Sequence, residues 1–237
     1  MSLNTGQLAA VLFDMDGTLL DSEKLWLEAQ TRTMARLGQH WSAADQADCL
    51  GGPLERVVDY MVDRSDPQAL ALIGAGGVSD LLLATMEQLF RTTPLRWQPG
   101  ARDMLVAVAI SGLPTALVTA SWRRLIIAVH NQIVADLGFD PFTVIVGGDE
   151  VSESKPHPAP YLRAAELLGV RPSHCLVLED SPTGVLSGLA AGCGVIAIPH
   201  VAPVPAAPGL VIISSLANQS LEDLWGRSTT ARESNQQ

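Results

Sequence analysis

Cysteine is scarce in this sequence of 237 residues, and its distribution excludes a disulfide scaffold. The three cysteines, Cys49, Cys175 and Cys193, are far apart, odd in number and outside any C-x-x-C pattern. Small secreted domains that depend on disulfides have dense, even sets of cysteines, whereas cytoplasmic proteins keep their thiols reduced. We therefore expect three free thiols in a cytoplasmic protein.

Positive charge is also scarce. The chain has 15 Lys and Arg against 25 Asp and Glu, a formal net charge of −10, and no run of basic residues. Proteins that follow a nucleic-acid backbone need clustered Lys and Arg, so no nucleic-acid partner is expected. A small phosphorylated molecule is compatible with an acidic protein when a bound metal ion supplies the positive charge.

Long apolar runs and a signal sequence are lacking as well. No apolar run approaches the ~20 residues of a membrane span, and the N-terminus has no basic region followed by an apolar core. We expect no membrane partner. Nothing in the sequence requires an oligomer, so a monomer is expected.

Short apolar runs, nearly continuous rather than alternating, are the main structural pattern. They predict buried strands at residues 10–13, 115–119, 144–146, 175–178, 195–198 and 210–213. Helical patterns separate most of them, at residues 100–110, 122–137, 158–168 and 182–191. Alternation of strand and helix predicts an α/β fold, a Rossmann-like core of three layers with a parallel sheet between helices.

One interval interrupts this alternation. Between Thr18 and Pro94 the pattern is helical only, clearest at residues 22–37, 54–64 and 78–91, with breaks at 51–53 and 74–77. We predict an all-α cap inserted after the first strand. The expected division is a catalytic core at residues 1–19 and 96–227, a cap at 20–95 and a disordered tail at 228–237.

Two acids follow the first predicted strand. Asp14 and Asp16 stand one residue apart before Gly17, in the sequence V-L-F-D-M-D-G-T. Ligands of parallel α/β sheets bind outside the carboxyl ends of the strands, where both acids would project. A lone D-x-D-G is also compatible with a turn or a helix cap. A calcium loop is disfavoured because the later acidic positions do not follow.

A second acidic pair, Glu179 and Asp180, ends another predicted strand. If both strands belong to one sheet, as many as four carboxylates converge at its edge, which is unfavourable unless a cation neutralises them. Oxygen-rich sites with room for water and phosphate suit Mg²⁺. We therefore predict a magnesium site formed by Asp14, Asp16, Glu179 and Asp180.

Two weaker signals complete the set. Thr119, Ala120 and Ser121 end a strand with a hydroxyl and the free N–H groups of a helix start, which can bind phosphate oxygens. Alone, such a sequence is an ordinary helix cap. Lys155 precedes Pro156 and a predicted helix; alone it would be a solvated surface charge, but the proline restricts its backbone.

The four motifs D-M-D-G-T, V-T-A-S, S-K-P and L-E-D-S, in this order, resemble those of the haloacid dehalogenase superfamily. With the helical insert, they are similar to the subgroup of β-phosphoglucomutase and sugar-phosphate phosphatases. The resemblance implies that Asp14 attacks phosphorus and that Asp16 serves as acid and base. It implies that Thr119, Ala120 and Ser121 bind the phosphoryl group, that Lys155 offsets charge, and that Mg²⁺ is the cofactor.

The same resemblance favours a phosphatase over a phosphosugar mutase. β-Phosphoglucomutase has a histidine early in its first cap helix, where this chain has Trp26, and basic residues beside its hinge glycine, where this chain has Leu50 and Leu54. Dehalogenases lack the acid at Asp16. A non-catalytic module of this fold would have lost Asp14 or Asp16. The expected function is hydrolysis of a small phosphate ester, a sugar or polyol phosphate, with the mutase as the alternative.

Overall fold

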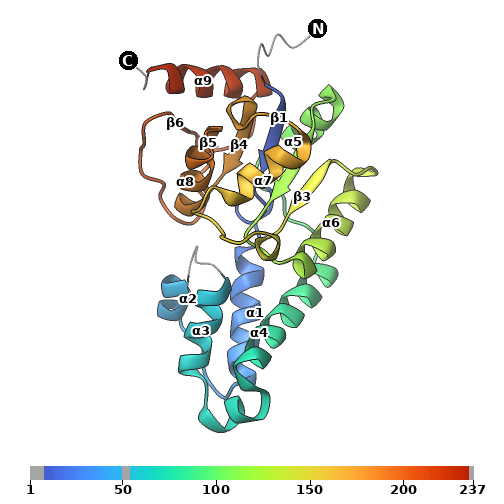
Figure 1. The fold of residues 1–237 in the computed structure, drawn as a ribbon. Coiled ribbons are helices and arrows are strands. Elements are labelled where there is room, and N and C mark those ends of the chain that lie inside the picture. The colour runs from blue at the N-terminus through green and yellow to red at the C-terminus, as the bar shows by residue number, and fades with distance from the viewer. Residues whose placement is uncertain (1–7, 50–53, 235–237) are drawn as a thin grey trace.

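The computed structural model describes residues 8–49 and 54–234. Its centre is a parallel sheet of six strands in the order β3-β2-β1-β4-β5-β6, so the predicted fold class is confirmed (Figure 1). The strands are β1 (Ala10–Phe13), β2 (Thr115–Val118), β3 (Val144–Val146), β4 (Cys175–Glu179), β5 (Gly194–Ala197) and β6 (Leu210–Ile212).

The strand register aligns the carboxyl ends of three neighbouring strands. Phe13 of β1 lies opposite Leu117 of β2 on one side and Leu178 of β4 on the other. The residues that follow these positions therefore come together at one edge. The strand order also reverses direction between β1 and β4, which is where open parallel sheets bind ligands.

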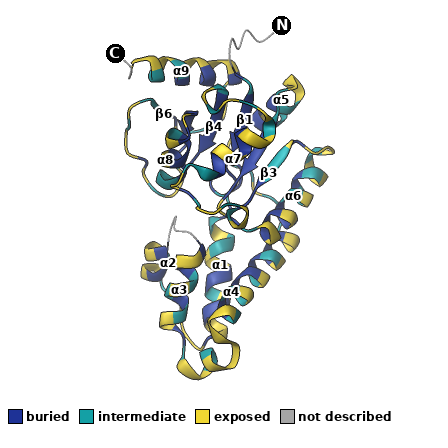
Figure 2. Ribbon diagram, in the orientation of Figure 1, coloured by how far each residue is buried: buried dark blue, intermediate teal, exposed yellow. Residues whose placement is uncertain are grey.

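Helices cover both faces of the sheet. Successive side chains of a strand point to opposite faces, and every residue of the four central strands β2, β1, β4 and β5 is buried. One face packs on α5 (Ala101–Ser111), α6 (Arg123–Leu137) and α9 (Leu221–Ser234). The other face packs on α7 (Ala159–Leu168) and α8 (Pro182–Ala190). Figure 2 shows the resulting continuous buried layer.

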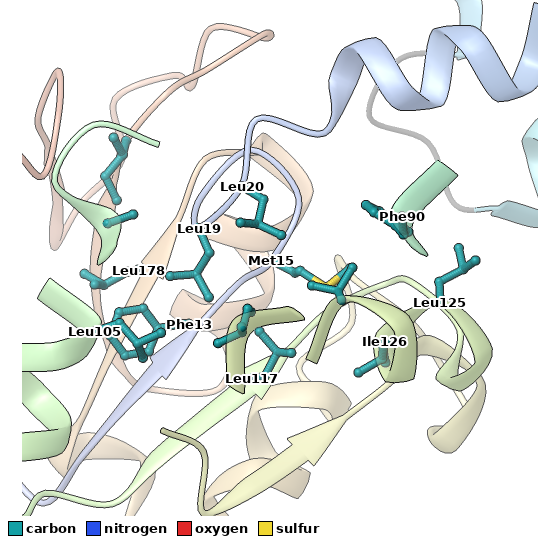
Figure 3. Close-up of a cluster of buried hydrophobic side chains, with 14 of the residues drawn as sticks. Phe13, Met15, Leu19, Leu20, Phe90, Leu105, Leu117, Leu125, Ile126 and Leu178 are labelled. Atoms are coloured by element: carbon teal, nitrogen blue, oxygen red, sulfur yellow. The ribbon is translucent and has the colours of Figure 1, made fainter. Parts of the chain in front are cut away.

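The loop after β1 is fixed by apolar anchors. Met15, Leu19 and Leu20 point into the same buried cluster as Phe13 and the residues of α6 (Figure 3). The N–H groups of Leu19 and Leu20 both donate to the carbonyl of Met15, at 3.0 Å each. Because the intervening side chains are held in the core, the acids beside them have a defined position at the sheet edge.

The insert consists of four helices, and no strand occurs in its described residues. They are α1 (Glu23–Arg36), α2 (Ala43–Cys49), α3 (Leu54–Arg64) and α4 (Pro67–Thr92). They form a separate helical unit next to the carboxyl edge of the sheet (Figure 1). The predicted break at residues 51–53 lies outside the described residues, whereas the break at 74–77 is a kink at Gly74 within α4.

Helix α2 was not predicted from the sequence, because it is short and has no large apolar side chain. Ser42 Oγ accepts from the N–H of Asp45, and Asp45 accepts in return from the N–H of Ser42 at 2.7 Å. Tyr60 and Arg64 of α3 then bind the same carboxylate, at 2.8 and 2.9 Å. A reciprocal cap and tertiary contacts therefore define this helix, rather than an apolar pattern.

Contrary to the expectation that no apolar stretch approaches the length of a membrane span, helix α4 is, by length and composition, apolar enough to cross a membrane. Gly74 has non-helical backbone angles within it, and its buried side chains pack against the other cap helices. It also packs beside α6 of the core, where Glu87 pairs with Arg124. We therefore assign α4 to the cap.

The predicted disorder of residues 228–237 is wrong for most of that segment, since α9 continues through Ser234. Ser228 is buried against the glycine that begins β5, and the guanidinium of Arg232 lies 4.9 Å from the ring centre of Trp225. Small and amphipathic residues form the buried face here, which a search for apolar periodicity does not detect. The last three residues lie outside the described part of the chain.

Candidate active site

Asp14 and Asp16 project from the carboxyl end of β1. The N–H of Asp14 still belongs to the sheet and donates to the carbonyl of Leu178 at 3.1 Å. The chain then turns at Gly17, where φ is 92° and an added Cβ would lie 2.1 Å from a carboxylate oxygen of Asp180. Only glycine allows both the turn and this close approach of the two strand ends.

Lys155 lies under Asp14 as a buried cation. Its ammonium group donates to Asp14 Oδ1 at 2.7 Å, to Glu179 Oε1 at 2.6 Å and to the carbonyl of Val118 at 2.8 Å. Burial lowers the pKa of Lys155, but the attraction of Asp14 and Glu179 outweighs burial and raises it above its ordinary value. The lysine is therefore a fixed positive charge, and all three of its donor sites have acceptors.

Glu179 is fully buried and positions its neighbours. Its Oε1 accepts from Lys155 and from the hydroxyl of Tyr161 at 2.8 Å, while its Oε2 accepts from the N–H of Asp180 at 3.0 Å. An added Cβ at Gly184 would lie 1.7 Å from Oε1, so the glycine of α8 makes room for the carboxylate. Both oxygens are occupied, which favours an orienting role over direct coordination of a metal.

Asp14 and Asp180 are poorly compensated in the absence of a cation. Burial, opposed by Lys155 and reinforced by Glu179, raises the pKa of Asp14 to about 7. Burial, followed by the charges of Asp14 and Glu179, raises the pKa of Asp180 to about 9. The only hydrogen bond to the Asp180 carboxylate among the described residues comes from Thr18, at 3.3 Å.

These groups fit a divalent cation. One carboxylate oxygen from each of Asp14, Glu179 and Asp180 lies within 4.8 Å of the others, and all three residues are buried. The donors are hard oxygens, and the raised pKa values mark negative charge that a cation would neutralise. Carboxylate donors of this kind suit a hard divalent cation such as Mg²⁺, which stays the predicted ion, with Asp14 and Asp180 as the expected direct ligands.

Asp16 is held by three donors from two parts of the molecule. From the segment leading into the cap, Ser22 Oγ donates to Oδ1 at 2.5 Å and Trp26 Nε1 donates to the same oxygen at 3.3 Å. From the loop after β2, Ser121 Oγ donates to Oδ2 at 2.8 Å. Trp26, which stands where the mutase has a histidine, also faces the cleft; its contact with Asp16 and both serine contacts were not predicted.

The loop after β2 lies beside Asp14, as predicted. Thr119 is buried, and its Oγ1 accepts from the N–H of Ser121 at 3.0 Å, which organises a tight turn before α6. Thr119, Ala120 and Ser121 all line the cleft between sheet and cap. Their assignment to phosphate binding stays a prediction. Arg123, which follows this loop at the start of α6, pairs with Glu150 at 3.6 Å and does not line the cleft.

The cleft encloses about 190 Å³ between the sheet edge and the cap. All the predicted site residues except Glu179 line it directly, and Glu179 lies behind Lys155. Cap residues of α1, α2 and α3 form its other wall; they are Glu23, Trp26, Gln30, Gln46, Cys49, Leu54 and Val57. A buried carboxylate–lysine centre at the carboxyl edge of a parallel sheet, facing a helical cap, is the arrangement of a capped enzyme with a Rossmann-like core.

Residues 11–198 match the haloacid dehalogenase-like hydrolases, and the chain belongs to that family. It is 33% identical over 231 residues to hexitol phosphatase B of Escherichia coli K12, covering 93% of this chain and 98% of the relative. It is 32% identical over 200 residues to the protein CbbY of Rhodobacter capsulatus, covering 81% and 86%. The crystal structure of CbbY from Rhodobacter sphaeroides, 26% identical, superposes with a TM-score of 0.77 over 89% of this chain and 96% of that one.

The raised pKa values predict linked effects of pH and Mg²⁺ on stability. Between the ordinary carboxyl pKa of 3.8 and the raised values of about 7 and about 9, the folded protein binds protons that the unfolded chain releases. Without metal, the stabilisation that these two protonated carboxyl groups contribute should be fully present below pH 3.8. It should decline as the pH rises from there to about 9. Mg²⁺ replaces these protons, so it should raise the melting temperature by several degrees at alkaline pH and less under acidic conditions.

Thermal melts across this pH range, with Mg²⁺ or with excess chelator, measure this effect. Asp180→Asn is the matched variant, because it keeps the shape of the side chain and removes its charge; its Mg²⁺ shift should disappear. A Mg²⁺ shift that is equal at all pH values, or that survives in this variant, would contradict the assignment of the metal site.

Proposed function

We propose that this protein is a Mg²⁺-dependent phosphatase that hydrolyses a small sugar or polyol phosphate through a phosphorylated Asp14. The observation that carries the proposal is the pairing of two carboxylates with different surroundings. Asp14 is buried beside the predicted metal site and accepts a hydrogen bond from Lys155. Asp16 faces the cleft and accepts hydrogen bonds from hydroxyl groups and from the indole N–H of Trp26. One is suited to attack and the other to proton transfer.

In the first half-reaction, a carboxylate oxygen of Asp14 bonds to phosphorus as the bond from phosphorus to the ester oxygen breaks. Asp16 gives its proton to that leaving oxygen, which departs as an alcohol. In the second half-reaction, Asp16 takes a proton from water, whose oxygen attacks the same phosphorus. The bond between phosphorus and Asp14 breaks, inorganic phosphate is released, and the free carboxylate of Asp14 is regenerated.

The remaining residues offset charge and hold the phosphoryl group. Lys155 lies 2.7 Å from Asp14, where its charge orients the carboxylate and balances the incoming phosphate. Thr119 and the N–H groups of the loop at Ala120 are placed to bind phosphoryl oxygens. When bound by Asp14 and Asp180, with Glu179 orienting them, Mg²⁺ would supply the electrophilic charge that draws the anionic ester to an anionic nucleophile.

The cap excludes bulk water from this chemistry. Trp26 and Ser22 connect the start of α1 to Asp16, so the position of the cap and the position of the acid are coupled. The residue boundaries of core and cap, at 19/20 and 95/96, stay predictions. We also propose a monomer, since one chain supplies every residue of the site, and a location in the cytoplasm, since the three cysteines are free thiols.

The substrate class is supported by relatives. Hexitol phosphatase A of Escherichia coli K12 is 34% identical over 199 residues, and a fructose-1-phosphate phosphatase of the same organism is 28% identical over 189. A mutase must bind a bisphosphate at both ends. On the cleft wall formed by α1, this chain has Trp26 where the mutase has a histidine. This difference favours a phosphatase over a mutase.

Phosphate release tests the proposal. A panel of sugar, polyol and nucleotide monophosphates is assayed with Mg²⁺ and with excess chelator. We expect turnover of sugar or polyol phosphates that stops with chelator and returns with added Mg²⁺. Metal-independent turnover would contradict the proposed cofactor. No release from any compound, together with isomerisation of a glucose 1-phosphate in the presence of a bisphosphate activator, would establish the mutase instead.

A further inference from the structure

The cap wall of the cleft contains a buried polar group with no partner. Glu23, Trp26 and Gln30 lie three and four residues apart on α1, so they share one face of the helix, and all three line the cleft. Gln30 is only 4% exposed, and its Oε1 has no hydrogen-bond partner among the described residues. A buried amide oxygen without a partner is unfavourable, and a ligand hydroxyl would satisfy it.

Glu23 is a second acceptor on the same face, and its neighbours hold it in place. Gln46 of α2 donates to Glu23 Oε1 at 2.8 Å, and Trp41 Nε1 in turn donates to Gln46 Oε1 at 2.9 Å. This chain of contacts fixes one oxygen of the carboxylate and leaves Oε2 without a hydrogen bond to any described residue. Two acceptors, from Glu23 and Gln30, are therefore available to groups that donate hydrogen bonds.

The charges of the cleft are incompatible with a second anion. Four carboxylates line it; with Mg²⁺ on Asp14 and Asp180, those of Asp16 and Glu23 remain, and Lys155 and His200 are the only basic side chains of the lining among the described residues. Lys155 already has three acceptors, two of them carboxylates. His200 Nε2 lies 3.9 Å from a carboxylate oxygen of Asp21. Residues 50–53, which the structure does not describe, have the sequence L-G-G-P and add no basic side chain.

We propose that Glu23 and Gln30 form a subsite that accepts hydrogen bonds from the hydroxyl groups of the substrate and rejects a second anionic group. The substrate is then the monophosphate of a neutral polyol or sugar, rather than a bisphosphate or a phosphorylated acid. This inference rests on the proposed phosphatase function. The expected substrate of this chain therefore differs from the ligand of its relative CbbY, one structure of which contains xylulose 1,5-bisphosphate.

The unmodified protein provides the first test. Values of kcat/KM are measured with Mg²⁺ for three probes: a hexitol 6-phosphate, fructose 1,6-bisphosphate, and acetyl phosphate, which has no hydroxyl group. We expect the hexitol phosphate to exceed the bisphosphate by about 100-fold, because a site built for hydroxyl groups leaves a second phosphate uncompensated. Equal turnover of these two would overturn the subsite. Absence of turnover with all three, acetyl phosphate included, would instead refute the proposed function.

Two variants then assign the subsite to its residues. Gln30→Met removes the amide at nearly constant volume and should lower the ratio of kcat/KM for the hexitol phosphate to that for acetyl phosphate by about tenfold. Glu23→Gln keeps the shape and removes the charge, and it should raise the relative kcat/KM of the bisphosphate by about tenfold. Gln88→Met, on an exposed position of α4 outside the cleft, is the matched control and should leave both ratios unchanged.

Unchanged ratios in both active-site variants would overturn the assignment. If Gln30→Met does not fold, as judged by its melting curve, the unmodified protein and Glu23→Gln still decide the question, because the charge argument depends on neither the amide nor its packing.

Discussion

Replacing Asp14 with Asn lowers phosphate release by about four orders of magnitude or more. The amide has the size of the carboxylate but is a poor nucleophile, and it removes one of the two carboxylates that hold Lys155. It also removes one expected Mg²⁺ ligand. Because the nucleophile is required for both half-reactions, the loss should appear in kcat with every substrate, including those with good leaving groups.

The matched control is Asp59→Asn, the same change at an exposed position of α3. It should retain full activity, which separates the loss of the nucleophile from a general effect of charge. Both variants are checked by thermal melts and circular dichroism for a native fold. Near-normal turnover by a folded Asp14→Asn protein would mean that another group attacks phosphorus.

Replacing Asp16 with Asn has the second-largest expected effect, a loss of about 100-fold to 10,000-fold in turnover of an alkyl phosphate. An alkoxide leaves poorly without a proton, and Asn cannot supply one. Acetyl phosphate has a leaving group that needs no proton. With this substrate the variant should still phosphorylate Asp14 but fail to activate the water that releases phosphate, so phosphorylated protein accumulates.

Rapid quench with acetyl phosphate measures both steps separately. Ser22→Ala is the companion variant, since it removes the 2.5 Å hydrogen bond to Asp16 without removing the carboxylate. Ser22→Ala should also slow phosphate release and let phosphorylated protein accumulate, but less than Asp16→Asn does. If Asp16→Asn slows hydrolysis of acetyl phosphate and of an alkyl phosphate equally, and no phosphorylated protein accumulates, Asp16 is not the acid and base.

Much of the site could be predicted from sequence because local patterns encode it. A buried strand that ends in acids places those acids at the sheet edge, whatever the rest of the chain does. With Asp14 and Asp180 at the carboxyl ends of parallel strands of one sheet, both are expected at the same edge; that β1 and β4 are neighbours there is known only from the structure. The structure adds the strand register: Phe13 of β1 lies opposite Leu117 of β2 and Leu178 of β4, so the residues that follow these three positions are neighbours.

The unpredicted features depend on contacts between distant segments. Tyr161 is an ordinary apolar position of α7 in sequence, and only its contact with Glu179 gives it a place in the site. Trp26 acquires a role because the cap brings its indole N–H to Asp16. Gln30 becomes informative only when its burial and lack of partner are known. None of these has a local signal at the level of residue type or spacing.

The end of the ordered chain was predicted wrongly for a related reason. Polarity rises from residue 228 and predicted a disordered tail there, yet Ser228 packs closely on β5 and Arg232 stacks on Trp225. Small polar residues can form a buried helical face when the opposite surface is a glycine. Polarity is thus a poor guide to disorder at the edge of a sheet with close packing.

The most direct measurement locates the phosphoryl group on the protein. Asp16→Asn protein is mixed with acetyl phosphate and Mg²⁺, quenched in acid, digested, and mapped by mass spectrometry. The account predicts one acid-stable, alkali-labile phosphoryl group on the peptide that contains Asp14, absent when Mg²⁺ is chelated. A phosphoryl group on any other residue, or hydrolysis by this variant with no phosphorylated protein at any time, would contradict a mechanism through phospho-aspartate at Asp14.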